Sequence, residues 1–320
     1  MKLRFEPVCY DHAAALIGER PWDVSRDSNL MFAAFETTLK KYGLASFVVG
    51  IDIYNLEPEA YGCKVEEPRG NGAPAIKFSF CTEIQEIYDL ELNPEVDGRL
   101  PLMLHTAADL KHRYPETDVR VPLSGPFTIA AHLLGLEEML WQMVSSPHEV
   151  KGALFHLAEQ QILYMNAAMD RGLGVTFFES SVTPPLLSPE MFNDSVVPTI
   201  KYMFDAVSQV NVERPHLIIG GDTTSILDGI IECNPAYIIC PYETDQKAFL
   251  QHLKATDKTT VRVNLNPNVF TSEQFDPVIK EVERTAKLAS AYEAAVSIGT
   301  ILPYDAKPEW VNQVYDLLNG

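Results

Sequence analysis

The stretch that most constrains the fold is residues 212–227, VERPHLIIGGDTTSIL. A short and mostly apolar run, with His216 as the exception, stops at Gly220 and Gly221 and leads into a helical pattern. Such a run between turn residues predicts a strand that is buried on both faces and delivers its carboxyl end to a site. Asp222 follows the glycines, where a carboxylate either caps the next helix or acts on a substrate.

The same order of buried strand and following helix recurs about eight times along the chain, which predicts an α/β fold of the (β/α)8 TIM barrel type. Parallel strands that are covered on both faces read as near-continuous apolar runs, as these do. The expected strands are the run inside 212–221 and residues 3–10, 44–54, 118–128, 172–181, 234–242, 259–266 and 294–302.

Helices are expected over 27–43, 93–114, 146–170, 271–290 and 310–318, with another that opens at Ser188. Serine before proline and the spacing Thr271-x-x-Gln274 are the signals for three of these starts. No long linker divides the chain, so residues 1–320 are expected to form one domain. The N-terminal segment and the turn-rich loops 55–95 and 181–190 are expected to pass over the mouth of the barrel.

Charge and cysteine usage restrict the partners. The net charge of -19 argues against nucleic acid and anionic membranes, because no basic patch could release enough counterions. The five cysteines include no C-x-x-C pair, so neither a disulfide framework nor a zinc knuckle is indicated. No apolar run approaches a bilayer span and no secretory signal is recognised, so we expect a cytoplasmic protein.

Polar residues follow the expected strands at the end where a barrel of this kind carries its chemistry. Glu179 and Asp222 are the candidate catalytic residues, because carboxylates that face one pocket can serve as acid and base. The candidate substrate-binding residues are Asp52, Ser124, Phe127, Phe178, Tyr242, Glu243, Asn264 and Asn266. The alternative for each polar residue is an ordinary cap, turn or loop position, and for each aromatic residue a place in the core.

Three residues on neighbouring expected strands could hold a metal: Glu179, His216 and Cys240. The alternatives are a core histidine with satisfied nitrogens and a cysteine that acts as a small core residue. The sequence leaves both interpretations open.

Several segments together resemble the uroporphyrinogen decarboxylase superfamily, whose fold is a (β/α)8 barrel. They are SGPFTIAAHLLG (124–135), FFESS (177–181) followed by LSPEMF (187–192), GGDTT (220–224) and NLNP (264–267). Two further segments, 50–65 and 98–128, resemble the corrinoid-dependent methyltransferase branch more than the decarboxylase itself. The resemblance implies transfer of a methyl group between a small molecule and a corrinoid that is carried by a separate partner protein.

The resemblance also implies a zinc ion in those methyltransferases that activate a thiol. Their ligands are a His-x-Cys in the central strand and a cysteine near the last strand, and these positions correspond here to Ile218, Gly220 and about Thr300. None of these residues can bind zinc, so a methyltransferase of that design for a coenzyme-M-type thiol is not expected.

The mechanism expected from the resemblance begins with a small methyl donor in the barrel mouth, such as a methoxylated aromatic compound that undergoes O-demethylation. The Co(I) corrinoid attacks the methyl carbon, and Glu179 protonates the leaving oxygen or helps to hold a metal there. The first alternative is a decarboxylase for a tetrapyrrole, although residues 6–18 lack the arginine that such an enzyme carries near its N-terminus. The second is a barrel without catalytic activity that binds a ligand or partner.

Overall fold

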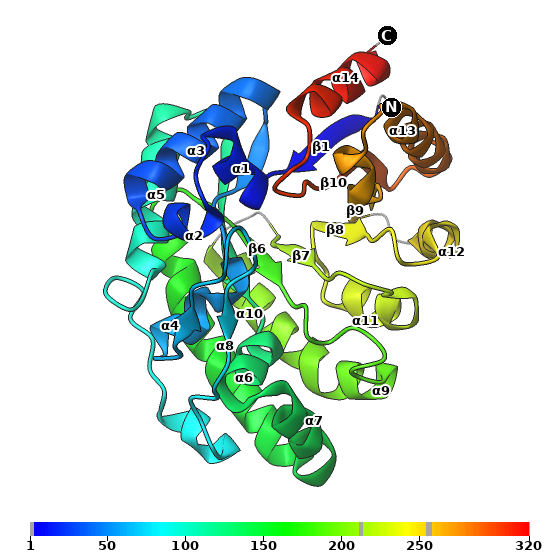
Figure 1. The fold of residues 1–320 in the computed structure, drawn as a ribbon. Helices are drawn as coiled ribbons and strands as arrows, with labels where there is room; N and C mark the ends of the chain where they lie inside the picture. The colour runs from blue at the N-terminus through cyan, green and yellow to red at the C-terminus, as the bar shows by residue number, and fades with distance from the viewer. Residues whose placement is uncertain (1–2, 211–213, 254–257, 320) are drawn as a thin grey trace.

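The computed structural model describes residues 3–210, 214–253 and 258–319. Eight strands form one parallel sheet in the order β1-β10-β9-β8-β7-β6-β5-β2, curved into a nearly closed barrel (Figure 1). This confirms the predicted (β/α)8 fold. The strands are β1 (Arg4–Val8), β2 (Ser46–Val48), β5 (Asp118–Ser124), β6 (Gly174–Phe178), β7 (His216–Ile218), β8 (Tyr237–Cys240), β9 (Thr260–Asn264) and β10 (Ala295–Ile301).

Helices surround the strands on the outside (Figure 1). Within the described residues, no helix is both long and apolar enough to cross a bilayer. The α-helices are α1 (Asp11–Leu16), α2 (Pro21–Val24), α3 (Ser28–Tyr42), α4 (Leu56–Ala60), α5 (Leu100–Arg113), α6 (Pro126–Leu134), α7 (Leu136–Ser145), α8 (Pro147–Met169), α9 (Pro189–Met191), α10 (Val197–Val210), α11 (Leu227–Glu232), α12 (Gln246–His252), α13 (Asp276–Ala289) and α14 (Pro308–Asn319).

Alternation along each strand separates the outer core from the barrel interior. On β5, Val119 and Val121 belong to the apolar core under the helices, whereas Arg120 lines a cavity inside the barrel. Successive side chains of a strand point to opposite faces, so every second residue of each barrel strand faces inward. Residues that face inward on different strands therefore meet even where they are far apart in sequence.

The second strand is shorter than predicted. The expected strand 44–54 stops at Val48, and Ile53–Asn55 form a 3-10 turn instead. Gly50 and Asp52 both have positive φ values, 131° and 60°, which strand pairing does not accommodate. The backbone therefore leaves the sheet before it reaches Asp52.

The sequence predicted where helices occur more accurately than it predicted their first residues. The helix expected over 93–114 begins at Leu100, and the one expected to start at Thr271 begins at Asp276. Thr271 instead ends a 3-10 turn whose start is capped by the Asn266 side chain. Ser188 does cap α9 through its side chain, as its serine-proline signal predicts. Residues 212 and 213 of the central stretch lie outside the described residues.

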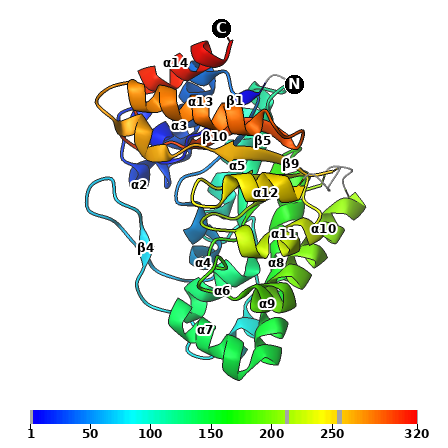
Figure 2. The same cartoon turned by 90° about the vertical axis from the view of Figure 1, so that its right-hand side faces the viewer.

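The segment after β2 leaves the barrel on the side of its carboxyl ends. It contains a short antiparallel pair, β3 (Val65–Glu66) and β4 (Ala75–Ile76), which stands out from the body of the molecule (Figure 2). Arg20, in the connection that follows β1, donates to the carbonyl oxygens of Pro68 and Gly70 and pairs with Glu67 at 2.7 Å. The excursions after the first two strands are therefore tied to each other at the barrel mouth.

Candidate functional site

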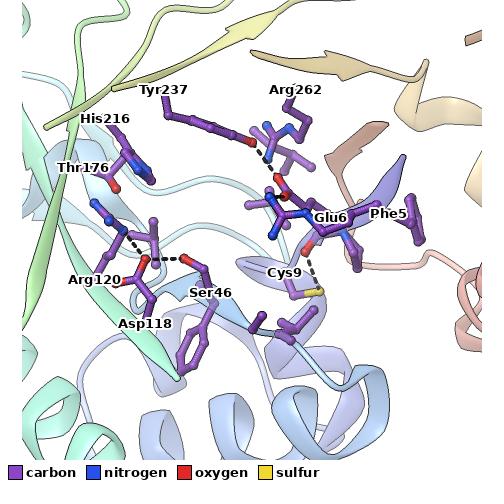
Figure 3. A pocket seen from close by; sticks show the side chains of 18 of the residues that line it. Phe5, Glu6, Cys9, Ser46, Asp118, Arg120, Thr176, His216, Tyr237 and Arg262 are labelled. Carbon is purple, nitrogen blue, oxygen red and sulfur yellow. Dashed lines mark hydrogen bonds and ion pairs between the residues drawn. The ribbon is translucent and has the colours of Figure 1, made fainter. Parts of the chain in front are cut away.

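A cavity of about 700 Å³ occupies the inside of the barrel (Figure 3). Ser46 and Asp118 line it at the amino ends of the strands, and Phe178 and Ile218 line it at the carboxyl ends. It also continues between β1 and β2 toward α3 and α14. Sites for small molecules have volumes of roughly 300–1,000 Å³, so this cavity could hold one.

Two arginines come from the same tripeptide, Val-Arg-Val, on β5 and β9. The valines pack outward into the apolar core, which turns Arg120 and Arg262 into the cavity. Both side chains belong to buried residues, with 3% and 6% of their surface exposed. The prediction of site residues missed them because it considered only the ends of the strands, although a charged residue in the middle of an apolar strand marks a polar barrel interior.

The two arginines have different partners. Arg120 Nε donates to Asp118 Oδ2 at 2.6 Å, and its Nη1 donates to the carbonyl oxygen of Val175 at 3.1 Å. Arg262 Nε donates to the amide oxygen Oδ1 of Asn264 at 3.0 Å. Within the described residues no carboxylate forms an ion pair with Arg262, and the side chain that accepts its hydrogen bond is the neutral amide of Asn264.

Polar side chains lie next to one another across four strands in the middle of the barrel. Strand register pairs Thr176 with His216, His216 with Tyr237, and Tyr237 with Thr260. The His216 ring stacks on Tyr237 with centroids 4.7 Å apart, and burial lowers the pKa of His216 to about 3, helped by the Arg120 charge. His216 is therefore a neutral imidazole at ordinary pH.

Aromatic rings frame the carboxyl end of the cavity. Tyr10 and Phe178 line it, and their rings meet edge to face at 6.3 Å. Tyr54 also packs edge to face against Phe178, at 6.1 Å, and accepts a hydrogen bond from Ser180 Oγ at 2.8 Å. Burial raises the pKa of Tyr10, so its phenol keeps its proton. Phe178 and His216 are the predicted site residues that line this cavity.

Glu179 follows Phe178 but points away from the cavity. It is fully buried, and its carboxylate accepts hydrogen bonds from Phe127 N at 3.3 Å, Thr128 N at 2.8 Å and Thr128 Oγ1 at 2.5 Å. Burial raises its pKa to about 7, against the lowering effect of these bonds. A Cβ on Gly125 would lie 2.0 Å from Glu179 Oε2, so only glycine fits there. The structure thus uses Glu179 to hold the first turn of α6.

Asp222 lies on the surface at the end of β7. Its Oδ1 accepts hydrogen bonds from Thr224 N at 3.1 Å, Thr224 Oγ1 at 2.7 Å and Thr244 Oγ1 at 2.9 Å. The bonds from Thr224 and Thr244 hold the pKa of Asp222 below its usual range. This is the capping alternative of the sequence analysis, with the additional effect of joining the loops after β7 and β8.

Asp52 lies in a buried ion-pair cluster at the barrel mouth. Its Oδ2 pairs with Arg99 Nη2 at 2.8 Å, and Asn55 Nδ2 donates to its Oδ1. Arg26 lies 4.0 Å away, and burial raises the pKa of Asp52 against the lowering effect of both arginines. A left-handed backbone at a residue other than glycine is uncommon, and it persists here because this cluster fixes the side chain.

The remaining predicted residues are dispersed. Asn264 contacts Arg262 in the barrel interior, and Asn266 accepts from Asn268 N at 3.0 Å. Ser124 and Phe127 are buried, and Ser124 N donates to the buried Glu57 at 2.7 Å. Tyr242 and Glu243 are exposed. Within the described residues, Asp52, Glu179, Asp222 and Asn264 make no hydrogen bond or ion pair with one another, and each has partners of its own.

The structure corrects the candidate metal site of Glu179, His216 and Cys240. His216 faces the cavity, Cys240 belongs to the apolar core outside it, and Glu179 caps α6. No group of three or more His, Cys, Asp or Glu side chains suited to a metal occurs among the residues that the structure describes. The positions that correspond to the zinc ligands of thiol-activating enzymes carry Ile218, Gly220 and Thr300, which do not fit zinc either.

Comparison with known proteins places this geometry among related barrels. The family model for uroporphyrinogen decarboxylase (URO-D) matches residues 10–319. A solved structure described as a methyltransferase from Methanosarcina mazei superposes with a TM-score of 0.81 at 15% identity, over 99% of this chain and 94% of the other. This likeness supports the barrel fold.

Curated relatives are of two kinds. Methylated-thiol--coenzyme M methyltransferase of Methanosarcina mazei is 24% identical over 63% of this chain and 53% of its own length. Methylcobamide:CoM methyltransferase MtaA of Methanosarcina barkeri is 24% identical over 55% of this chain and 51% of its own. Uroporphyrinogen decarboxylase of Carboxydothermus hydrogenoformans is 28% identical over 57% and 54%. The chain thus spans about half the length of the curated relatives it matches.

Proposed function

The chain belongs to the uroporphyrinogen decarboxylase family, and from this premise we propose that it is a methyltransferase that moves a methyl group between a small molecule and a corrinoid protein. Two of its relatives are methyltransferases, and the name of one states that it acts on a methylcobamide. A corrinoid on a partner protein would supply the cobalt centre that accepts or donates the methyl group. The reaction would take place in the barrel mouth.

The observation that carries the proposal is the cavity and where it leads. It extends to Tyr10, Phe178 and Ile218 at the carboxyl ends of β1, β6 and β7. Enzymes with this fold place their chemistry at that end of the strands. A small molecule held inside the barrel can therefore present its methyl group to a partner that docks over the mouth.

The cavity residues bind and orient the small molecule in this proposal. Phe178 and Tyr10 hold the part of the molecule nearest the mouth, because their rings meet there edge to face. The Tyr10 hydroxyl has no hydrogen-bond partner among the described residues, and its raised pKa keeps it protonated. It can donate a hydrogen bond to the oxygen from which the methyl group departs, and so stabilise the negative charge that develops there.

Glu179 acts by positioning in this proposal, since its carboxylate does not reach the cavity. Its bonds to Thr128 fix the first turn of α6, and Thr128 Oγ1 in turn accepts from Ser180 N at 3.0 Å and Ser181 N at 3.2 Å. The loop that follows Phe178 is held in this way, together with Tyr54 through Ser180. Protonation of the leaving oxygen by Glu179 is therefore replaced by donation from Tyr10.

The test is an anaerobic assay of the purified protein with free cobalamin in its Co(I) state and a panel of methoxylated aromatic compounds. We expect at least one compound to give the absorption spectrum of methylcobalamin in the presence of the protein and not in its absence. A Tyr10→Phe variant should slow this change by about tenfold to a thousandfold, since it removes one donor to the developing charge. No spectral change with any compound would contradict the proposal.

Decarboxylation of a tetrapyrrole is the second candidate, favoured by the Carboxydothermus relative. Release of carbon dioxide from uroporphyrinogen without any corrinoid would support it. A barrel that only binds a ligand is the third, and it would be supported if binding occurs while neither reaction does.

A further inference from the structure

We propose that the barrel interior is a binding site for a small aromatic carboxylate, with the carboxylate on Arg262 and the ring toward Phe178. As a statement about the substrate class, this rests on the proposed function. As a binding site, it rests on the cavity alone and is tested without any methyl transfer. Figure 3 labels Arg262, Thr176, His216 and Tyr237 among the residues that line the cavity.

Charged side chains of both signs line the cavity. Its charged side chains, histidine apart, are those of Arg4, Arg120, Arg262, Glu6 and Asp118. Arg120 pairs with Asp118 at 2.6 Å, and Arg4 pairs with Glu6 at 3.5 Å. These pairs use both carboxylates. In the described part of the chain, Arg262 is thus the cavity arginine without a carboxylate partner, although the protein as a whole is strongly acidic.

A buried guanidinium without an anion is energetically unfavourable. Arg262 is 6% exposed, and among the described residues its Nε bonds to Asn264 while its terminal nitrogens, Nη1 and Nη2, have no acceptor. Taking a charge out of water is costly unless an opposite charge and hydrogen bonds compensate it. Carboxylates suit this role because their two oxygens match the planar fork of arginine.

Near Arg262, other polar groups of the cavity have no hydrogen-bond partner among the described residues and could bond to a ligand. Thr176 is 2% exposed and lines the cavity, and its Oγ1 is buried without a hydrogen-bond partner. His216 is its neighbour in register and, among the described residues, makes no hydrogen bond through either ring nitrogen. Together with the Tyr10 hydroxyl, these are polar groups within the described residues that a polar ligand would satisfy.

The walls of the cavity favour an aromatic ring on that carboxylate. Tyr237 and His216 form a stacked pair on one wall, and Tyr10 and Phe178 lie at the carboxyl end. Arg262 lies in the middle of β9, two residues before its last, whereas Phe178 is the last residue of β6. A ligand with its carboxylate on Arg262 would therefore direct its far end toward the mouth of the barrel.

The first arm of the test uses the wild-type protein and three probes of similar shape: benzoate, benzamide and methoxybenzene. Isothermal titration calorimetry should show that benzoate binds about tenfold to a hundredfold more tightly than either neutral probe, as expected for charge-assisted hydrogen bonds. Equal binding of benzoate and benzamide, or no binding of benzoate, would overturn the proposal. This arm does not depend on any variant.

The second arm tests whether Arg262 is the residue that binds the carboxylate. Arg262→Gln should weaken benzoate binding about tenfold or more and leave methoxybenzene binding unchanged, and Arg262→Lys should restore part of the loss. The matched control is Arg171→Gln, because Arg171 lies outside the barrel, pairs with Glu95 at 2.7 Å and carries the same charge. If Arg171→Gln weakens benzoate binding as much as Arg262→Gln does, the effect of charge is non-specific and the proposed site is overturned.

The two proposals fail in different ways. If methylcobalamin forms from an uncharged donor but benzoate does not bind, the methyltransferase proposal is supported and the carboxylate site is contradicted. If benzoate binds at Arg262 but no donor gives methyl transfer, the carboxylate site is supported and the proposed reaction is contradicted.

Discussion

Arg120 and Arg262 occupy equivalent positions, each between two valines on a barrel strand, but Arg120 has a carboxylate partner at 2.6 Å and Arg262 has only the neutral oxygen of Asn264 at 3.0 Å. The same tripeptide thus serves two purposes. Arg120 is part of the internal structure of the barrel, and Arg262 gives the cavity an unbalanced positive charge. In our proposal, this difference determines which class of small molecule binds.

Breaking the ion pair at the barrel mouth should destabilise the fold. Arg99→Ala would leave Asp52, whose side chain is 3% exposed, without its closest cation. We expect a loss of about 3–5 kcal/mol in the free energy of unfolding, because a buried charge would remain unpaired. Urea denaturation measures it.

The control for that prediction is Arg113→Ala, since Arg113 is 67% exposed and pairs with Glu36 at 3.8 Å. A surface pair of this kind contributes about 1 kcal/mol or less. Equal losses in the two variants would show that the Asp52 cluster does not stabilise the mouth.

Glu179 should make stability depend on pH in an unusual direction. Burial raises its pKa to about 7 from the ordinary glutamate value of 4.5, so between these pH values the folded protein holds a proton that the unfolded chain releases. Stability from this group is therefore present at low pH and is lost as pH rises through about 7. Relative to Glu179→Gln, the wild-type free energy of unfolding should fall by about 3 kcal/mol between about pH 4 and about pH 8. A difference that is flat or rises would contradict the burial of this carboxylate.

His216 should remain neutral under all ordinary conditions. Burial and the Arg120 charge lower its pKa to about 3 from the ordinary histidine value of 6.5, so between these pH values the unfolded chain binds a proton that the folded protein does not. The resulting stability is present above pH 6.5 and is lost as pH falls toward 3. The imidazole NMR signals of His216, assigned by comparison with His216→Gln, should show no titration between about pH 8 and about pH 4.5. A titration midpoint near pH 6.5 would contradict the burial of the ring, because it would mean that water or an anion solvates it.

Gly299 should be intolerant of a side chain. A Cβ there would lie 2.0 Å from the carbonyl oxygen of Glu6 on β1 and 2.9 Å from Arg262 Cδ. Gly299→Ala should cost about 1–3 kcal/mol or more, because the backbone of β1 would have to move. Gly220→Ala is the control, since nothing lies within 4 Å of its Cβ. Thermal unfolding of both variants measures the difference, and equal melting temperatures would contradict the close approach of β1 and β10.

The fold could be predicted because its signals are local. Apolar runs of strand length, each followed by a helical pattern, occur at every barrel strand, and capping residues such as Ser188 mark a helix start within a few positions. The errors also have local causes that the sequence does not make explicit. The positive φ values of Gly50 and Asp52 are incompatible with a longer β2, and the turn capped by Asn266 displaced the start of α13.

The site was harder to predict because its contacts are not local. Glu179 is bound by Thr128, 51 residues away, so no spacing in the sequence indicates that its carboxylate turns toward α6. Asp222 is different, since Thr224 is only two residues away and the turn could be anticipated. Arg120 and Arg262 could also have been predicted as cavity residues, because the pattern Val-Arg-Val inside a barrel strand places the arginine on the inner face.

The most direct test of the account is the fate of a labelled methyl group. With purified protein, Co(I) cobalamin and 4-methoxybenzoate that carries ¹³C in its methoxyl group, NMR should show the label moving from the aryl ether to cobalamin, with 4-hydroxybenzoate as the other product. Arg262→Gln should reduce this transfer about tenfold or more at low substrate concentration, while Arg171→Gln should not. Label that stays on the ether with wild-type protein, although the same sample binds the compound, would contradict the account.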